Sequence, residues 1–242
     1  KKIEDTTGLE NCVNLKELNL YDNDLRNLDG IKNLENLTYL HIGTKDEKGE
    51  RKQVNLTNEE ISKLNLPKLK TLVMQGNRNI TDLSFTSNLP ELTALYVKAT
   101  GCIDLTTVSS HVTTVYSNNQ FVTEDKQSIV GDTLTLKVKE IKNRDGSTPT
   151  ITPNNEGVYD AEKGTITWTG LTKETTSLSY GWAGKDTFSG TVTVPVEVKE
   201  DKVVNVPDEN LRKELKKALG VTEDKELTQT KLASLTSFWA TD

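Results

Sequence analysis

The sequence predicts a mixed α/β protein, in which a leucine-rich repeat solenoid with a parallel β-sheet is followed by an all-β sandwich and a small α-helical segment. Three observations support this fold class. Leucines recur with a period of about 22 residues before residue 120, and apolar residues then alternate with polar ones in short runs. After residue 200 the apolar residues take the i, i+4 spacing of a helix.

Residues 1–120 repeat one pattern. Leu15, Leu18 and Leu20 alternate as a short strand, and Asn23 follows three residues later, where its side chain can bond main-chain groups at the bend. The strands of the later coils begin at Leu37, Leu69, Leu92 and, more weakly, Val112. Because one coil cannot bury its own leucines, about five coils must stack, starting in the middle of a repeat.

The second coil carries an insertion over residues 43–64. Its charged first half predicts a surface loop. Thr57 and Glu60 have the spacing of a capping box, which predicts a short helix after Thr57.

The two cysteines, Cys12 and Cys102, occupy positions that hold leucines in neighbouring coils. They lie about four coils apart, or roughly 19 Å at ~4.8 Å per strand, which is too far for a disulfide. We therefore predict two free, buried thiols that act as apolar filler.

Residues 121–200 show period-two alternation over several short runs separated by turn-forming stretches such as "TPNNEG". This pattern predicts an antiparallel β-sandwich. Its core is expected to rest on Trp168, Trp182 and Phe188, together with the aliphatic faces of the strands.

Residues 201–242 predict two helices. Asp208 is the expected N-cap and Gly220 the expected C-cap of the first, and the second is expected to start after Thr228 and to present Leu232 and Leu235. The apolar stripe of the first helix consists of Leu211, Leu215, Ala218 and Leu219.

Two stretches resemble the internalin family of Gram-positive bacterial surface proteins. The sequence "NEGVYDAEKGTITWTGLTKETTSLSYGW", followed by "DTFSGTVTVPVEV", is similar to the immunoglobulin-like domain of that family. The sequence "VVNVPDENLRKELKKALG" is similar to its helical cap. The resemblance implies an immunoglobulin-like domain over residues 121–200 and, over residues 201–242, an N-terminal-type repeat cap with the start of a new repeat. It also implies an extracellular protein, secreted or attached to the cell surface.

The order of these parts differs from the family pattern, in which the cap precedes the repeats. If Leu235 opens a coil, Phe238 and Ala240 take its strand positions, and Ile3 and Leu9 continue the same coil. The chain is either an excerpt of a tandem array or a rearranged module, and both interpretations stay open. Because an uncapped coil exposes core leucines, we expect head-to-tail self-association between residues 205–242 and the first repeat.

The concave face of the sheet is the candidate site for a protein partner, because its side chains are not needed for folding. The expected partner-binding residues are Tyr21, Tyr39, His41, Tyr96, Tyr116 and Trp239. Tyr and Trp often dominate protein interfaces, although exposed strand positions also favour aromatic residues in general. The resemblance implies recognition of a protein on a host or neighbouring cell, and the alternative is a spacer module without a partner of its own.

Other function classes receive little support. His41 and His111 fall in different coils and have no serine or cysteine at a recognisable motif spacing, so we expect no catalytic site, metal site or cofactor. The "DND" run that begins at Asp22 is expected to form a turn, because Arg26 stands where a calcium loop needs a ligand. A net charge of -6 without basic clusters argues against nucleic acid, and no apolar run is long enough to span a membrane.

Overall fold

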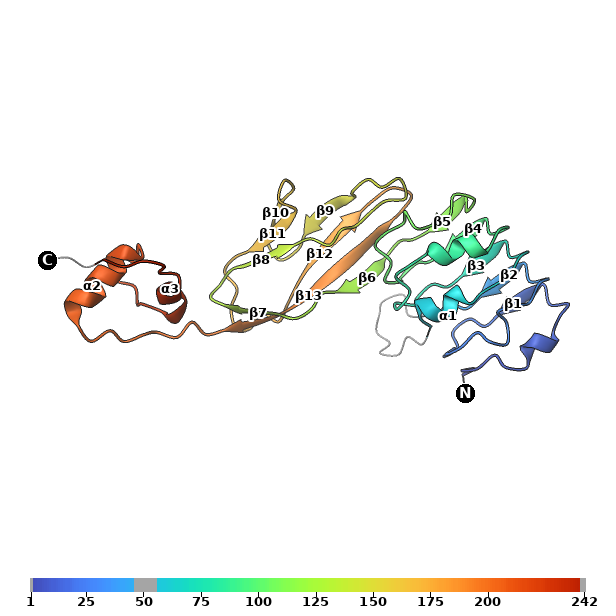
Figure 1. Ribbon diagram of the computed structural model, residues 1–242, viewed down its shortest axis with the longest axis horizontal. Helices are drawn as coiled ribbons and strands as arrows, with labels where there is room; N and C mark the ends of the chain where they lie inside the picture. The colour runs from blue at the N-terminus through green and yellow to red at the C-terminus, as the bar shows by residue number, and fades with distance from the viewer. Residues whose placement is uncertain (1, 46–55, 240–242) are drawn as a thin grey trace. The chain divides into compact units, whose positions relative to one another are not determined.

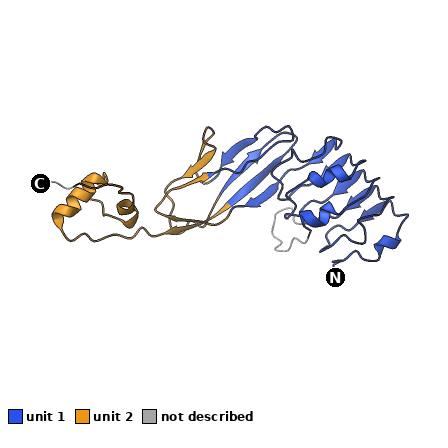
Figure 2. Ribbon diagram, in the orientation of Figure 1, with its two compact units in different colours: residues 1–124, 137–154, 179–193 blue, residues 125–136, 155–178, 194–242 orange. Residues whose placement is uncertain are grey.

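The computed structural model describes residues 2–45 and 56–239. The charged part of the predicted insertion loop, residues 46–55, and the predicted strand position Ala240 lie outside the described residues. The chain divides into two compact units, shown in Figure 2. One consists of residues 1–124, 137–154 and 179–193, and the other of residues 125–136, 155–178 and 194–242. The division into 1–120, 121–200 and 201–242 stays a prediction.

The repeats form one parallel sheet, as predicted (Figure 1). Its strands lie side by side in chain order and are three residues long: β1 (Glu17–Asn19), β2 (Tyr39–His41), β3 (Thr71–Val73), β4 (Ala94–Tyr96) and β5 (Thr114–Tyr116). Main-chain bonds between coils continue past the strands, for example from Asp22 N–H to the Gly43 carbonyl at 2.9 Å. Short strands are therefore part of a longer hydrogen-bonded ladder.

The inward positions of the middle coils form the core. The central residues of β2, β3 and β4 are Leu40, Leu72 and Leu95, which pair in register and are fully buried. Complete burial of a leucine stabilises the fold by roughly 1.5–3 kcal/mol. The outward residues of the same strands are left free to form a surface.

Buried polar side chains close the bends after β3, β4 and β5. The amide nitrogen of Asn77 donates to the Ile42 carbonyl of the preceding coil (3.0 Å) and to the Met74 carbonyl of its own coil (2.9 Å). Gln120 makes the equivalent two contacts two strands further along, to Val97 and Ser117 (2.7 and 3.0 Å). The contacts of Asn77 confirm the role predicted for the asparagine that follows a strand.

The first coil is much less buried than the sequence pattern implies. Residues 3–6 stack on the next half-turn of chain: Asp24 N–H donates to the Ile3 carbonyl (2.9 Å), and Gly30 N–H donates to the Thr6 hydroxyl (3.1 Å). Gly30 has to be glycine, because a Cβ there would lie 1.8 Å from the Thr6 carbonyl oxygen. No described coil packs on the outer side of this turn, so Ile3 remains 45% exposed.

The two cysteines are free, as predicted, but only Cys102 is buried. Burial raises the pKa of the Cys102 thiol to about 12, which makes it unreactive. The prediction that Cys12 is buried is wrong. Cys12 follows the 3-10 helix η1 (Leu9–Asn11) in the first coil, whose outer side is not covered by any coil of the described residues.

The predicted helix in the insertion is α1 (Asn58–Ser62), with Thr57 as its N-cap accepting a hydrogen bond from Glu60 N–H. The Glu60 carboxylate accepts a bond from the distant Leu28 N–H (3.2 Å) and pairs with Lys63. It therefore fastens the insertion to the first coil. A 3-10 helix, η2 (Ser84–Asn88), forms the corresponding segment of the third coil.

The sandwich strands form two sheets. One has the order β10-β11-β8, and the other has the order β6-β13-β12-β9 with β7 also paired to β13. Their bounds are β6 Gln120–Thr123, β7 Gln127–Val130, β8 Leu134–Lys137, β9 Thr150–Pro153, β10 Val158–Asp160, β11 Thr165–Trp168, β12 Ser177–Ala183 and β13 Ser189–Lys199. The prediction of a purely antiparallel sandwich is wrong, because β6 and β7 both run parallel to β13. The chain passes from β6 to β7 without reversing, so two short strands share one long partner.

The predicted aromatic core residues are buried. Trp168, Trp182 and Phe188 are 0%, 3% and 0% exposed. The rings of Trp182 and Phe188 meet edge to face with centroids 5.6 Å apart, a favourable aromatic geometry.

Both predicted C-terminal helices are present. Helix α2 (Glu209–Ala218) starts at Asp208, whose carboxylate accepts a bond from Leu211 N–H (2.8 Å), and ends before Gly220 at φ +61°. Helix α3 (Gln229–Ala233) is capped by Thr228. The predicted stripe is only partly covered, with Leu211 42% exposed.

We predict that Asn77→Ala lowers the free energy of unfolding by about 2–4 kcal/mol, because it leaves two buried carbonyls without a donor. Chemical denaturation with a fluorescence readout measures the change. The matched control is Asn14→Ala, at an exposed residue without a side-chain hydrogen bond in the described chain, for which we expect less than about 0.5 kcal/mol. Equal effects of the two variants would contradict the role of the buried amide.

Candidate functional site

The outward residues of the repeat sheet line up in rows across the strands. One row consists of Asn19, His41, Val73, Tyr96 and Tyr116, and a second of Glu17, Tyr39, Thr71, Ala94 and Thr114. The register therefore brings five of the six predicted binding residues to one face, since Tyr21 stacks on His41 beside the first row. We call this surface the concave face.

The first aromatic cluster lies on β2 and just after the end of β1. The Tyr21 and His41 rings stack with centroids 4.8 Å apart, and the edge of Tyr39 meets His41 at 6.5 Å. Burial in this cluster lowers the pKa of His41, so its ring is neutral at physiological pH. Its Nε2 atom is buried and has no hydrogen-bond partner in the described chain. An unpartnered buried nitrogen is costly, and a bound partner could satisfy it.

The second cluster lies on β4 and β5. The rings of Tyr96 and Tyr116 stack with centroids 4.6 Å apart and an interplanar angle of 17°. Tyr116 is nonetheless 44% exposed. Because each ring already restrains the other, this pair presents a large, ordered apolar surface to solvent.

Smaller residues separate the two clusters. Val73 is only 8% exposed, and Thr71 precedes it on β3. Gly43 follows β2, where a Cβ would lie 2.8 Å from the Gln75 side chain. The concave face therefore has an aromatic cluster near each end, and the smaller side chains between the clusters project less far from the sheet.

Trp239 is not part of either cluster. It belongs to the other compact unit and is 86% exposed. Its predicted role in partner binding therefore has no support from the geometry of the concave face.

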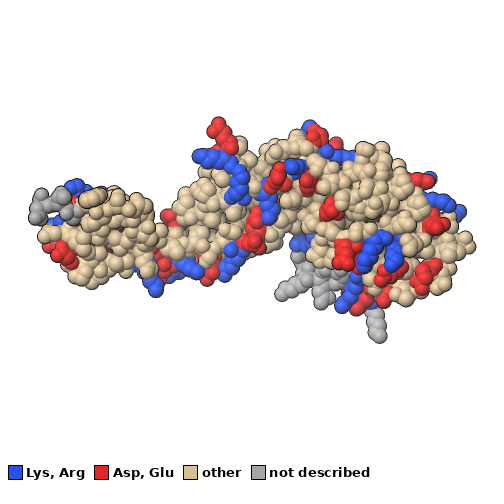
Figure 3. All heavy atoms as spheres, viewed as in Figure 1, with Lys and Arg blue, Asp and Glu red and all other residues tan. Residues whose placement is uncertain are grey.

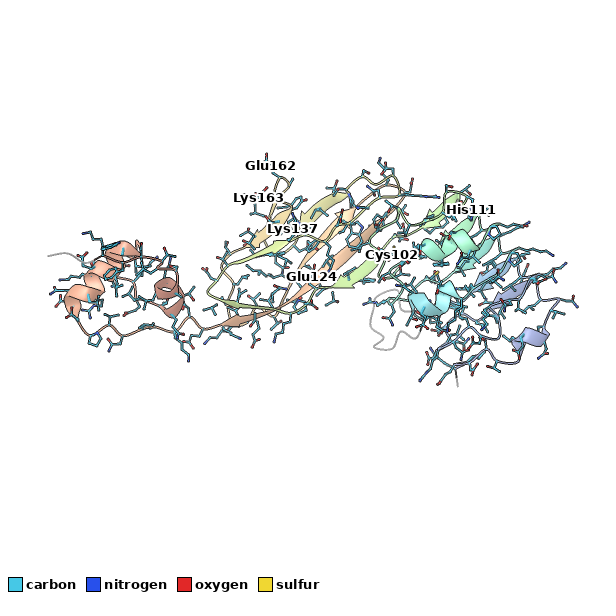
Figure 4. The ribbon with its side chains drawn as sticks, in the orientation of Figure 1. Cys102, His111, Glu124, Lys137, Glu162 and Lys163 are labelled. Atoms are coloured by element: carbon cyan, nitrogen blue, oxygen red, sulfur yellow. The ribbon has the colours of Figure 1, made fainter. Side chains whose placement is uncertain are left out.

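The sequence prediction missed the partner of His111, which is labelled in Figure 4. The Ser109 hydroxyl lies 2.8 Å from Nδ1 of His111, and Nε2 lies 2.9 Å from the Leu89 carbonyl. A carbonyl can only accept, so Nε2 carries a proton and donates to Leu89. The expectation from the sequence concerned only catalytic motif spacings, so it did not anticipate this contact. The two residues lie only two positions apart in a turn, and they fasten the last coil to the preceding one.

The remaining observations concern charge and membranes. Acidic and basic side chains are interspersed over the displayed surface of each unit (Figure 3). Asn23 lies at a turn, with its amide donating to the Leu20 carbonyl (3.0 Å), as predicted for the "DND" run. Among residues 2–45 and 56–239, no helix is both long and apolar enough to cross a bilayer.

Residues 120–196 match the family model of the internalin J immunoglobulin-like domain. The resemblance to the internalin family is confirmed. Over 86 residues the chain is 29% identical to Internalin J of Listeria monocytogenes, in sequences from serovar 1/2a and serotype 4b. This match covers 35% of the chain and only about a tenth of either relative.

The fold is also similar to a solved internalin structure. The secreted internalin-like protein Lmo2445 from Listeria monocytogenes superimposes with a TM-score of 0.52 at 17% identity, covering 76% of this chain and 68% of that one. At this level of identity the likeness shows a shared fold.

We predict that Tyr21→Ala raises the pKa of His41 toward its ordinary value of 6.5, because the variant exposes the imidazole. An NMR pH titration of the His41 ring measures this shift. The depressed pKa also means that the cluster's contribution to stability is present above pH 6.5 and is lost as the pH falls through the folded-state pKa.

Tyr116→Ala is the matched control, because it removes an aromatic ring from the second cluster. An unchanged His41 titration in Tyr21→Ala would show that burial by Tyr21 is not the cause of the depressed pKa.

Proposed function

We propose that the chain belongs to a non-enzymatic bacterial protein, secreted or attached to the cell surface, that binds a protein on a host or neighbouring cell through the concave face. The observation that supports it most directly is the second aromatic cluster, in which Tyr116 remains 44% exposed although it stacks on Tyr96. These rings contribute little to the leucine core. Burial of these rings against a partner would remove apolar surface from water, which the isolated chain does not achieve, and would therefore favour binding.

The arrangement of the face fits the energetics of protein recognition. Binding is opposed by the ordering of interface side chains, at about 0.5–1.5 kcal/mol for each. The stacked pairs Tyr21–His41 and Tyr96–Tyr116 are ordered before the partner arrives. The His41 Nε2 atom also provides a specific polar contact, since a donor from the partner would satisfy it.

The size of the concave face limits which shapes of partner it can bind. Five strands at ~4.8 Å spacing give a sheet about 19 Å wide. A standard interface buries about 800 Å² on each partner, so the partner must contact the rims of the solenoid as well as the sheet. The partner is therefore expected to be a folded domain that is convex at its point of contact.

We predict that Ala substitution at Tyr39 and at Tyr96 each weakens adhesion of the purified chain to a binding cell type at least tenfold, as expected for aromatic hot spots. Flow cytometry with fluorescently labelled chain measures the apparent Kd. Tyr159→Ala is the matched control, because Tyr159 lies on β10 in the sandwich.

Thermal unfolding separates this role from a spacer role. Loss of binding in the Tyr39 and Tyr96 variants with retained cooperative unfolding supports recognition. Unchanged binding in both variants would instead favour a module that only extends a binding region away from the cell.

We further propose head-to-tail self-association, in which residues 235–239 of one molecule continue the first coil of another. The exposed apolar side chains at the two surfaces support it: Ile3 is 45% exposed, Val13 60% and Trp239 86%. On this proposal residues 201–242 act as a cap, which covers the open outer side of the first coil of its neighbour.

Trp239→Ser is expected to shift the sedimentation coefficient of a concentrated sample toward that of the monomer, because it removes the largest exposed apolar side chain from this contact. Analytical ultracentrifugation over a concentration series measures association. Val158→Ser is the control, since Val158 is 70% exposed but lies on β10. A wild-type chain that stays monomeric at high concentration would contradict the proposal.

A further inference from the structure

Strand β5 leaves one edge of the repeat sheet unpaired. Thr114 and Tyr116 turn their main-chain groups toward β4, since Thr114 N–H donates to the Thr93 carbonyl (2.9 Å) and the Tyr116 carbonyl accepts from Val97 N–H (2.8 Å). Successive residues of a strand direct these groups to opposite sides. The N–H and C=O of Val115 therefore point away from β4, and within residues 2–45 and 56–239 neither makes a hydrogen bond to protein.

A cavity of about 330 Å³ borders this edge. Strand β5 and its flanking residues supply one wall, residues 113–117, and loops that connect sandwich strands supply Arg144 and residues 185–187. All lining residues belong to one compact unit (Figure 2). Five residues of extended chain span about 16 Å at ~3.3 Å each, so the edge is long enough to pair with a short peptide segment.

The cavity contains the unfinished end of the solenoid core. Val115 occupies the central inward position that Leu95 holds one coil earlier, but Val115 is only half-buried. Ser117 follows it at the third inward position, is 1% exposed and has a hydroxyl without any hydrogen-bond partner in the described chain. A buried hydroxyl left unpaired costs about 1–3 kcal/mol. An occupant could cover Val115 with an apolar side chain, and one of its main-chain groups could form a hydrogen bond with the Ser117 hydroxyl.

The opposite wall is a tight turn. Phe188 N–H donates to the Lys185 carbonyl (2.9 Å), and both intervening residues have left-handed backbones, with φ +52° at Asp186 and +68° at Thr187. Such a turn favours Gly or Asn, and a β-branched Thr is strained there. The surrounding hairpin holds this strain, and strained backbone is concentrated at binding sites.

The charged groups in the lining are only partly neutralised. Lys185 pairs with Asp145. Arg144 donates through Nη2 to the Ser109 carbonyl (2.8 Å), and no carboxylate in the described chain forms an ion pair with it. Asp186 forms no ion pair among the described residues, although its charge, after that of Asp145, also raises the pKa of Lys185. The site therefore offers one cation and one anion to an occupant.

We propose that the open edge of β5 binds an extended peptide, which adds to the repeat sheet as a sixth strand. The peptide places a β-branched apolar residue against Val115, an acidic side chain beside Arg144 and a basic one near Asp186. Main-chain pairing with Val115 supplies affinity, and the two charges supply specificity. This site is distinct from the concave face, with which it shares only Thr114 and Tyr116.

The test is a selection from a phage-displayed library of random dodecapeptides on the whole chain. We expect peptides rich in Val, Ile and Thr that carry both charges, and at least tenfold weaker binding of a synthetic selected peptide to Val115→Pro, which lacks the open N–H. Arg144→Gln should weaken binding about fivefold while keeping a donor for the Ser109 carbonyl. Arg26→Gln, at an exposed arginine of the first coil, and Tyr39→Ala, on the concave face, should leave binding unchanged.

Amide NMR of the wild-type chain gives a readout that does not depend on the folding of Val115→Pro. The selected peptide should shift the Val115 amide, and N-methylation of its central residues should abolish the shift. The proposal is overturned if no peptide is enriched, if the N-methylated peptide binds equally well, or if the shifts map to the His41 cluster. It is also overturned if a second copy of the chain occupies the edge, seen as a dimer that Val115→Pro dissociates.

Discussion

Each coil of the repeat unit depends on hydrogen bonds that its neighbour supplies. The strands are only three residues long, so neither a strand nor a coil could satisfy its own main chain or bury its own leucines. At the bends, the buried amides of Asn77 and Gln120 provide donors for main-chain carbonyls. Each amide donates to a carbonyl of its own coil and to one of the preceding coil. Stacking is therefore a condition for folding, and the coils are held in one register.

That register also creates the concave face. Parallel strands lie ~4.8 Å apart, and aromatic residues that share a row are consequently held at a stacking distance. The centroid separation of 4.6 Å between Tyr96 and Tyr116 follows directly from the pairing of β4 with β5. The same constraint that buries the leucines thus orders the surface that we propose for recognition, at no further entropic cost when a partner binds.

The same dependence on neighbours explains why both ends of the sheet are distinctive. At β1 the outer side of the first coil has no described neighbour, which leaves Ile3 and Cys12 exposed although both occupy core positions of the repeat. At β5 the main-chain groups of Val115 are open, and Ser117 takes an inward position otherwise held by an apolar residue. An additional chain segment would therefore form the most new contacts at these two ends. It would do so by association at the first coil or by strand addition at the last strand, β5.

The sequence by itself determined the repeat, the presence of one short strand in each coil, the buried leucines, the caps at Thr57, Asp208 and Thr228 and the aromatic core of the sandwich, because each follows from local periodicity or from a residue's own hydrogen-bonding groups. It also placed five of the six candidate residues on one face, since a constant repeat offset fixes the rows. Only the tertiary structure decided what depends on neighbours far apart in the chain. It decided the exposure of Cys12, the parallel pairing of β6 and β7 with β13, the bond between Ser109 and His111 and the cavity beside β5. Periodicity records which side of a strand faces inward, but burial and pairing require a second segment, and its position is a property of the whole fold.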